Sequence, residues 1–464
     1  MVGAGVSGLS AAYFVRRRLG NDHPLTVLDT SGEPGGKVRT TDVAGLAVDT
    51  GPDAFLARAA DLGGLIDELG LRPAVVEPMS SGAYVWSRGR LRPLPPGAAF
   101  GLPERLWPLL RSGLLSPVGV ARAGLDLVLP PSQPDGDATI EDLVRPRFGA
   151  EVYERLVEPL LGGVHAGDPA VLSARSAVPE IAALAGRGRS IYLTMRKRRP
   201  PRATSSQRRP AALVSLHGGM GRLVDALVDA VGPSAITSGV GVLSVTRGPD
   251  NSLLVRTDQG ELHADDVVVA TPSWAAADLV AESSPGAAEL LHAIPYVNVA
   301  NVTLAFPRSD VPALPPGTGF LVPPAEGELI VGCTWLTNKW PHLAQDDVVL
   351  IKAMVGRYGD DRWLSMDDDV LVGQVREGLH RMIGVAAEPL DRLVQRWPRS
   401  MPQYVVGHAE RLDAIDAELD ATFDDGHAHR SVHLTGAAYR GVGLAGCVTQ
   451  ASATAERIVE GVRT

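Results

Sequence analysis

Three glycines and one acid near the start of the chain have the residue types and spacing needed to bind a dinucleotide. Gly3, Gly5 and Gly8 form the pattern G-x-G-x-x-G, and an apolar stretch that predicts a helix follows directly. Such a turn brings backbone N–H groups and a helix N-terminus to a pyrophosphate. Asp29 ends the next predicted strand, 21 residues after Gly8, where a carboxylate can bind a ribose hydroxyl. The alternative is an ordinary glycine turn with an incidental carboxylate.

The strand that should precede this turn is almost missing from the sequence. Only Met1 and Val2 stand before Gly3, whereas a strand usually has about five residues. We therefore expect the natural chain to begin upstream of Met1, and we expect weak cofactor retention if it does not.

A second glycine-rich segment follows the acid and favours a flavin over a nicotinamide. Gly35, Gly36, Lys37 and Arg39 lie where backbone N–H groups can reach the diphosphate and an arginine can offset its charge. This stretch resembles the signature of the flavin-containing amine oxidase superfamily. The resemblance implies FAD as the cofactor.

The same resemblance assigns further cofactor contacts to three segments in the first two thirds of the chain. Residues 48–55, which include Gly51 and Pro52, correspond to the segment that runs along the flavin ring; their alternative interpretation is a simple Gly-Pro turn. The backbone of Val242 corresponds to a contact with adenine. Thr271 ends a strand that packs beside the cofactor.

The C-terminal end contains another G-x-G-x-x-G pattern, at residues 441–446. Only 18 residues follow Gly446, which is too few for a second strand–helix–strand unit with its own acid. The resemblance instead identifies this stretch as the closing flavin segment, in which Gly436 approaches the diphosphate and Gly443 and Leu444 bring a helix N-terminus to the flavin ring.

Several motifs in the middle of the chain are similar to one branch of this superfamily, the oxygen-dependent protoporphyrinogen and coproporphyrinogen oxidases, and especially to their actinobacterial type. These motifs are residues 88–97, 156–169, 172–173, 338–340 and 401–404. Two residues depart from the branch: His165 stands where tyrosine is usual, and Asp29 stands where glutamate is commoner.

The resemblance implies a six-electron oxidation of coproporphyrinogen III to coproporphyrin III in haem biosynthesis, with oxygen as acceptor and hydrogen peroxide as by-product. Protoporphyrinogen IX is the alternative substrate. No catalytic side chain is assigned, because the flavin carries the redox step. Arg88, Arg90 and Arg92 are candidates for binding substrate carboxylates; their alternative role is that of solvated arginines on a strand or loop.

Two further functions remain open. An amine oxidase of the same fold usually has a lysine near the reactive flavin nitrogen, but alignment places Asn301 there. Cys447 also lacks the sequence context of a covalent flavin attachment. The other alternative is a non-catalytic porphyrin carrier that docks to a ferrochelatase through the basic segment described below.

Composition favours a multidomain enzyme of the cytoplasm. The chain has 464 residues, of which 45% are hydrophobic, and a net charge of −9, which argues against nucleic-acid binding. Its two cysteines, Cys333 and Cys447, cannot form a disulfide framework and have no metal-ligand spacing, so we expect no metal. No apolar run reaches the length of a membrane span, although a peripheral membrane contact stays open.

One basic segment contradicts the acidic average. Residues 195–210 contain seven cationic side chains and no acid, with prolines and serines that oppose regular structure. We interpret residues 196–212 as a mobile loop, either a solvated linker or a cationic funnel for an anionic ligand.

Together these assignments predict an α/β fold with three parts. A discontinuous, Rossmann-like FAD domain spans residues 1–75, 213–285 and 425–464. A mixed-sheet substrate domain spans residues 76–98 and 286–424, and a helical lobe spans residues 99–195.

Overall fold

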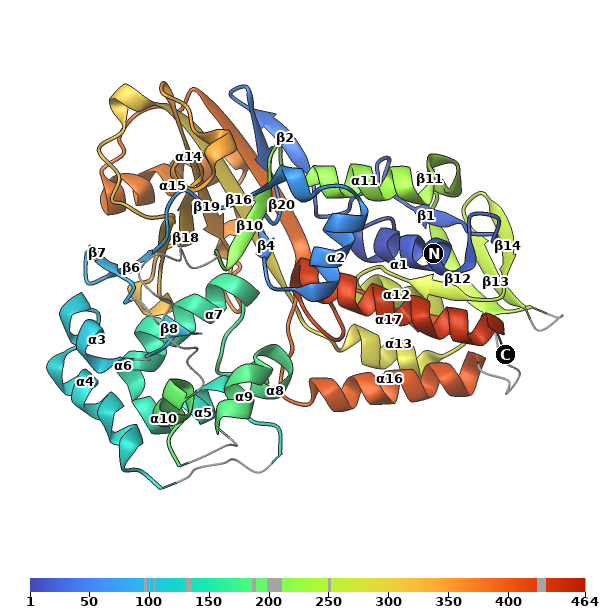
Figure 1. Ribbon diagram of the computed structural model, residues 1–464, viewed down its shortest axis with the longest axis horizontal. Helices are drawn as coiled ribbons and strands as arrows, with labels where there is room; N and C mark the ends of the chain where they lie inside the picture. Colours follow the sequence, from blue (N-terminus) through green and yellow to red (C-terminus); the bar gives the residue numbers. More distant parts are fainter. Residues whose placement is uncertain are drawn as a thin grey trace.

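The computed structural model describes residues 1–95, 98–99, 101–103, 105–130, 136–185, 189–197, 211–248, 252–423 and 431–463. The chain forms a parallel-sheet unit, a seven-stranded mixed sheet and a helical lobe, which occupy the right, the upper left and the lower left of Figure 1. The expected α/β fold class is confirmed. Most of the basic segment, residues 198–210, lies outside the described residues.

Segments from the beginning, middle and end of the chain build the parallel-sheet unit. Val2 forms parallel bridges with both Leu28 and Val269, so a one-residue bridge joins two pairs of strands into one sheet. The strands on either side of it are β11 (Ile236–Ser238), β1 (Val27–Asp29), β15 (Val267–Val269) and β21 (Val432–Leu434).

Helices cover both faces of this sheet, because successive strand residues point to opposite sides. Val268 packs into one core, while Val267 and Val269 pack into the other. The first core is covered by α1 (Val6–Leu19), α2 (Ala60–Glu68), α11 (Gly221–Val231) and α17 (Gly443–Arg463). The second is covered by α12 (Ser273–Val280), α13 (Pro285–His292) and α16 (His408–Phe423). A small antiparallel sheet of β12 (Val242–Arg247), β13 (Leu253–Thr257) and β14 (Gly260–Ala264) lies beside α12.

The seven-stranded sheet is mixed, because β17 and β6 pair in parallel while its other neighbouring strands pair antiparallel. In spatial order its strands are β20 (Asp391–Pro402), β16 (Tyr296–Pro307), β19 (Val348–Val355), β18 (Ile330–Trp335), β17 (Gly319–Leu321), β6 (Tyr84–Ser87) and β7 (Arg90–Pro93). Helix α15 (Asp368–Ile383) packs against it through one shared hydrophobic core.

The helical lobe has a hydrophobic core of its own. Its helices are α3 (Leu106–Ser112), α4 (Pro117–Gly124), α5 (Ile140–Phe148), α6 (Ala150–Val152), α7 (Glu158–His165), α8 (Ala174–Ala177), α9 (Pro179–Ala185) and α10 (Ile191–Lys197). A buried ion pair joins Arg147 to Asp126, with Nε and Oδ1 2.6 Å apart. Helix α7 contacts β17 and β18, and this contact joins the lobe to the seven-stranded sheet.

Candidate functional site

The first glycine turn leaves open space directly before α1. Gly8 must lack a side chain, because a Cβ atom there would lie 1.9 Å from the carbonyl oxygen of Gly3. A Cβ atom on Gly5, in contrast, would meet no atom of the described residues within 4 Å. Gly5 is the N-cap of α1, and the first-turn N–H groups of a helix have no partner within the helix. This open end is suited to an anionic group.

Asp29 joins this turn to the second glycine-rich segment. Its Oδ2 atom accepts the N–H of Ala4 at 2.6 Å, and its Oδ1 atom accepts the N–H of Ser31 at 2.7 Å. Gly35 donates its N–H to the carbonyl of Ala4, and a Cβ atom on Gly36 would lie 3.3 Å from the Cα atom of Gly5. The acid and both glycine segments therefore meet at one place, as the sequence predicts.

The start of α17 reaches the same place from the end of the chain. Gly436 has a φ of +131°, and a Cβ atom there would lie 3.6 Å from the Oγ atom of Ser7 in α1. A Cβ atom on Gly443 would meet nothing among the described residues, whereas Leu444 is buried. Because α1 and α17 pack against each other, their N-termini face a common region.

Two buried hydroxyl groups at the edge of the parallel sheet lack partners. Thr271 and Thr435 follow the neighbouring strands β15 and β21, and the Oγ1 atom of each has no hydrogen-bond partner among the described residues. A buried hydroxyl without a partner costs free energy, so such groups indicate a bound polar ligand. We therefore find that these residues fit a dinucleotide.

The segment before Val242 is bonded to the backbone around Asp29. The N–H of Val240 donates to the carbonyl of Asp29, and the N–H of Gly239 donates to that of Ser31, each at 2.9 Å. Val242, which begins β12, is thereby held close to the acid, which fits an adenine contact by its backbone.

The remaining predicted cofactor residues differ in their surroundings. Lys37 donates its Nζ to the carbonyl of Ser400 at 2.7 Å, and burial lowers the pKa of its ammonium group. Arg39 is exposed and donates to its own loop, at the carbonyl of Gly36. Gly51 packs tightly, because a Cβ atom there would lie 2.1 Å from the carbonyl oxygen of Lys37, while Pro52 is exposed.

Comparison with known proteins agrees with this geometry. The profile of flavin containing amine oxidoreductases matches residues 6–459. The chain belongs to this family. It is 32% identical over 458 residues to the coproporphyrinogen III oxidase of Bacillus subtilis, covering 98% of this chain and 96% of the relative. It is 31% identical to the coproporphyrinogen III oxidase of Mycobacterium tuberculosis, covering 99% and 97%. The crystal structure of a protein assigned as a protoporphyrinogen oxidase, from an Exiguobacterium species, has a TM-score of 0.86 and 31% identity, covering 99% and 98%.

Family membership makes the protein a flavin-dependent oxidoreductase. Bound flavin is the group that takes up electrons from the substrate. The residues of this chain that would hold it are the two glycine turns, Asp29, the segment around Val242, the hydroxyl groups of Thr271 and Thr435, and the start of α17.

Asn301, which the sequence predicts at the position of the amine-oxidase lysine, lies on β16. Its Nδ2 atom donates to the carbonyl of Thr50, at 2.7 Å. Trp397 donates to the same carbonyl at 3.2 Å, and Lys352 donates to the carbonyl of Asp49 at 2.8 Å. Neither Trp397 nor Lys352 belongs to a motif that the sequence reveals. The one sequence feature that points to Lys352 is its place as a charged residue inside the apolar strand β19.

The three candidate substrate arginines lie far from these residues within the sheet. They belong to the hairpin of β6 and β7 at one edge, whereas β20, which carries Trp397, forms the other edge. The backbone N–H of Arg88 bonds to Glu326, and Arg92 donates to the carbonyl of Ser87. Arg90 is exposed. The structure does not bring them to the cofactor residues, and their role in substrate binding stays a prediction.

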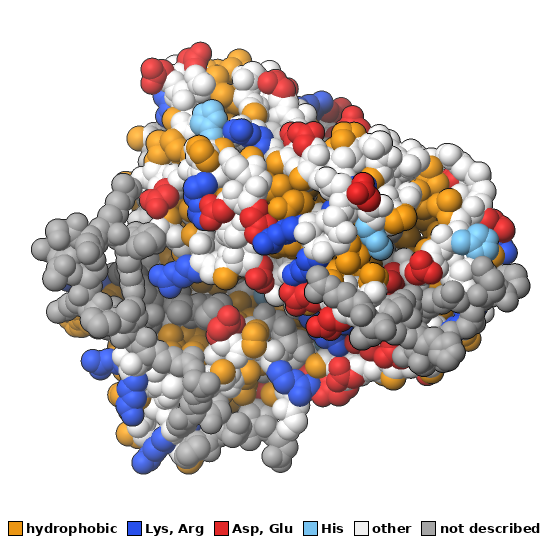
Figure 2. Space-filling model, turned by 45° about the vertical axis from the view of Figure 1, so that its right-hand side comes forward, with side chains coloured by type: hydrophobic (Ala, Val, Ile, Leu, Met, Phe, Trp, Pro, Cys, Tyr) orange, Lys and Arg blue, Asp and Glu red, His pale blue; other side chains and the backbone are white. Residues whose placement is uncertain are grey.

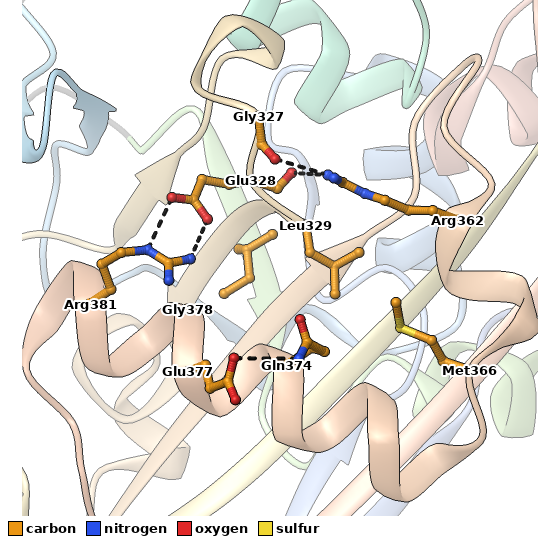
Figure 3. Close-up of a pocket in the computed structure, with 10 residues that line it drawn as sticks. Gly327, Glu328, Leu329, Arg362, Met366, Gln374, Glu377, Gly378 and Arg381 are labelled. Atoms are coloured by element: carbon orange, nitrogen blue, oxygen red, sulfur yellow. Dashed lines mark hydrogen bonds and ion pairs between the residues drawn. The ribbon is translucent and has the colours of Figure 1, made fainter.

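Two adjoining hollows are lined in part by the same three residues, Gly327, Glu328 and Arg362. The smaller, of about 200 Å³, is shown in Figure 3. There Arg381 pairs with Glu328, and Arg362 donates to the carbonyls of Gly327 and Glu328. Its arginines are therefore already engaged with protein groups.

The larger hollow, of about 380 Å³, contains a cationic group that is only partly satisfied. The Nε atom of Arg357 is buried without a partner among the described residues, and burial lowers the pKa of this guanidinium group. The next residue, Tyr358, donates its N–H to the carbonyl of Ala166, directly after α7. Tyr358, which lines this hollow just after β19, is therefore bonded to the helical lobe.

The motif at residues 401–404 joins the three parts of the molecule. Gln403 donates its Nε2 to the carbonyl of His165 at 2.9 Å. The hydroxyl of Tyr404 donates to the carbonyl of Ala437 at 2.8 Å and accepts the N–H of Gly441 at 3.0 Å. Burial lowers the pKa of His165 to about 4, so its ring is neutral at pH 7.

Other site types find no support in the part of the chain that the structure describes. Across those residues, no group of three or more His, Cys, Asp or Glu side chains is placed to hold a metal ion. None of the described helices combines the length and apolar character needed to cross a membrane. Cys333 and Cys447 are both buried free thiols.

Proposed function

We propose that the protein uses FAD and oxygen to oxidise coproporphyrinogen III to coproporphyrin III in haem biosynthesis. The observation that carries this proposal is the similarity, over almost the whole chain, to relatives named coproporphyrinogen III oxidase. The cofactor cradle supports FAD in particular, because it combines a diphosphate turn, a ribose-binding acid and an adenine-facing strand.

The proposed reaction balances without a further co-reactant. Six electrons and six protons leave the porphyrinogen, and three oxygen molecules take them up as three molecules of hydrogen peroxide. Aromatisation of the macrocycle supplies the driving force. The protein must hold one bridge carbon at the flavin and exclude water, so no acid–base constellation is required.

Arg357 places a positive charge in a hollow where a substrate carboxylate could bind. A half-buried guanidinium group gains a charge-assisted hydrogen bond when a propionate enters the hollow that it lines. Arg357 lines the 380 Å³ hollow, and the next residue, Tyr358, bonds to Ala166 directly after α7. We therefore propose Arg357, in addition to Arg88, Arg90 and Arg92, as a candidate for binding propionate groups.

Protoporphyrinogen IX is the second candidate substrate, supported by the similarity to the Exiguobacterium protein. It carries two carboxylates fewer than coproporphyrinogen III. The test is anaerobic mixing of the FAD-loaded protein with each porphyrinogen, followed by oxygen, while flavin absorbance and porphyrin fluorescence are recorded. Rapid flavin bleaching with peroxide release supports the oxidase. Porphyrin binding without bleaching would instead identify a carrier.

Peripheral contact with a membrane is supported by the exposed surface of the helical lobe. Trp107, Val118 and Val128 are 66%, 77% and 62% exposed, and the cations Arg105 and Arg111 are exposed near them in sequence. Lys and Arg side chains also lie beside hydrophobic ones at the lower left of Figure 2. Apolar and cationic groups together favour an anionic lipid surface.

Flotation with vesicles of anionic and of neutral lipid tests this contact. Binding to anionic vesicles should fall for Trp107→Ser, and equal flotation of both proteins with anionic vesicles would argue against the contact. We place the enzyme in the cytoplasm, in line with its free thiols. A ferrochelatase contact of residues 196–212 stays a prediction.

A further inference from the structure

Three consecutive carbonyl groups, those of residues 49–51, are held by side chains from three neighbouring strands. Asn301 on β16 and Trp397 on β20 both donate to the carbonyl of Thr50, at 2.7 and 3.2 Å. Lys352 on β19 donates to the carbonyls of Asp49 and Gly51, at 2.8 and 3.4 Å. Every backbone oxygen of this short segment therefore accepts a bond from the sheet.

Strand register explains why these side chains reach one segment. Thr303 pairs with Lys352, and Val299 pairs with Trp397 on the other side of β16. Residues 299, 301 and 303 point to the same face, because side chains alternate along a strand. Asn301, Lys352 and Trp397 therefore form a diagonal row on that face, which we call the carbonyl clamp.

The ammonium group of Lys352 is unusual in its burial. The side chain is only 5% exposed, and a buried charge is costly unless it is paired. The charged side chains that act on it are Asp49, Asp53 and Lys339. Burial raises the pKa of Asp49 to about 6, so that carboxylate is a weak counter-charge in mildly acidic solution.

Asp53 is the stronger counter-charge, but its direct partners are other residues. Lys339 donates to its Oδ2 at 2.8 Å, and Trp340 donates at 3.0 Å. The cations Lys339 and Lys352, together with these hydrogen bonds, outweigh burial and hold the pKa of Asp53 well below its usual range. Among the described residues, the ammonium group of Lys352 donates its hydrogen bonds to the carbonyls of Asp49 and Gly51, so its charge is directed at residues 49–51.

We propose that Lys352 is a positioning residue for the flavin and that its charge also favours the reduced cofactor. The carbonyl clamp fixes the segment that is expected to run along the flavin ring. A buried cation beneath that segment stabilises the negative charge that a flavin gains on reduction. This inference rests on the flavin site of the proposed function and does not depend on the identity of the substrate.

Two substitutions at one position separate charge from positioning. Lys352→Gln keeps a hydrogen-bond donor and removes the charge, whereas Lys352→Met removes both. Lys339→Met is the matched control, because it deletes a second, partly buried lysine of the same charge cluster whose ammonium group bonds to Asp53 and not to residues 49–51. The readouts are the midpoint potential of bound FAD, the FAD retained per chain and the Tm of the apoprotein.

For Lys352→Gln we expect the ratio of reduced to oxidised flavin at a fixed potential to fall about tenfold, which is about 30 mV for a two-electron couple. Lys352→Met should show the same shift and weaker FAD retention. Lys339→Met should change the ratio by less than about threefold. The proposal would be overturned if a folded Lys352→Gln protein kept the midpoint potential of the parent. It would also be overturned if Lys339→Met shifted the midpoint potential as much as Lys352→Gln does.

Asn301→Ser keeps the proposal testable if both Lys352 variants fail to fold. The shorter side chain cannot reach Thr50, and loss of one hydrogen bond should weaken FAD binding about tenfold. Unchanged FAD affinity would then overturn the positioning role. None of these readouts uses a porphyrinogen. A wrong substrate assignment, revealed by the mixing experiment, can therefore be distinguished from a wrong role for Lys352.

Discussion

The side-chain amide of Gln403 donates to the backbone carbonyl of His165, and this bond joins the strand β20 to the last turn of α7. The next residue, Tyr404, bonds to the loop that leads into α17. One dipeptide therefore connects the helical lobe, the mixed sheet and the flavin cradle.

Replacement of Gly5 should affect FAD binding, whereas replacement of Gly8 should affect the stability of the fold. Gly5→Val should fold and lose FAD, because Gly5 has extended backbone that valine adopts and its side-chain space is open in the protein. Gly8→Ala should destabilise the fold by about 1–3 kcal/mol, since its Cβ atom would collide with Gly3. FAD absorbance per chain and apoprotein Tm measure the two effects. A Gly5→Val protein that retains FAD at the parent ratio would contradict the site.

The sequence predicts this cradle well because each glycine turn is specified by neighbouring residues. The clamp of Asn301, Lys352 and Trp397 was not predictable in the same way. It arises from the register of β16 with two strands that lie about 50 and 100 residues away along the chain. The place of Arg357 in the larger hollow likewise depends on the folded structure and cannot be predicted from the sequence. The prediction for Arg88, Arg90 and Arg92 rests only on their residue type.

We expect FAD to be bound without a covalent link. The thiol of Cys447 is buried in α17, where burial raises its pKa and Ser7 provides a hydrogen bond. A neutral, buried thiol is a poor nucleophile. Acid precipitation should release the flavin into the supernatant. The native Cys447→Ala protein should still bind FAD. Yellow colour that stays with the washed precipitate is the opposing result.

Amines should not reduce the flavin. Asn301 is engaged with the carbonyl of Thr50 at the position where amine oxidases have a lysine, and its amide has no basic nitrogen. Benzylamine or putrescine mixed anaerobically with the FAD-loaded protein should leave the visible absorbance of the oxidised flavin unchanged. A porphyrinogen serves as the positive control. Bleaching by an amine at a comparable rate would favour amine oxidation instead.

His408 should make the protein less stable as the pH falls. Burial lowers its folded-state pKa to about 4 from the ordinary value of 6.5, so unfolding takes up a proton between these values. The stabilisation is fully present above pH 6.5 and is lost as the pH falls towards 4. It amounts to at most about 3 kcal/mol. His165 and His342 act in the same sense, whereas the raised pKa of Asp49 acts in the opposite sense.

Denaturant unfolding of the parent chain and His408→Phe isolates this contribution. Phenylalanine retains a ring to stack on Tyr404, whose centroid lies 4.1 Å from that of His408. It cannot be protonated, although it loses the bond to the carbonyl of Tyr439. The difference in free energy of unfolding between the two proteins should shrink from pH 7 to pH 4. A difference that is constant with pH would show that His408 titrates normally.

Arg357 should bind substrate rather than stabilise the fold. Arg357 lines the larger hollow, so a propionate bound there would meet a half-buried guanidinium group. Loss of one charge-assisted hydrogen bond costs about 1.5–3 kcal/mol, and Arg357→Met should therefore raise KM for coproporphyrinogen at least about tenfold. FAD content and Tm should remain close to the parent values. The matched control is Arg381→Met, which removes an arginine that Glu328 already engages in the adjoining hollow. Equal effects of the two substitutions on KM, or none from Arg357→Met, would remove Arg357 from the substrate site.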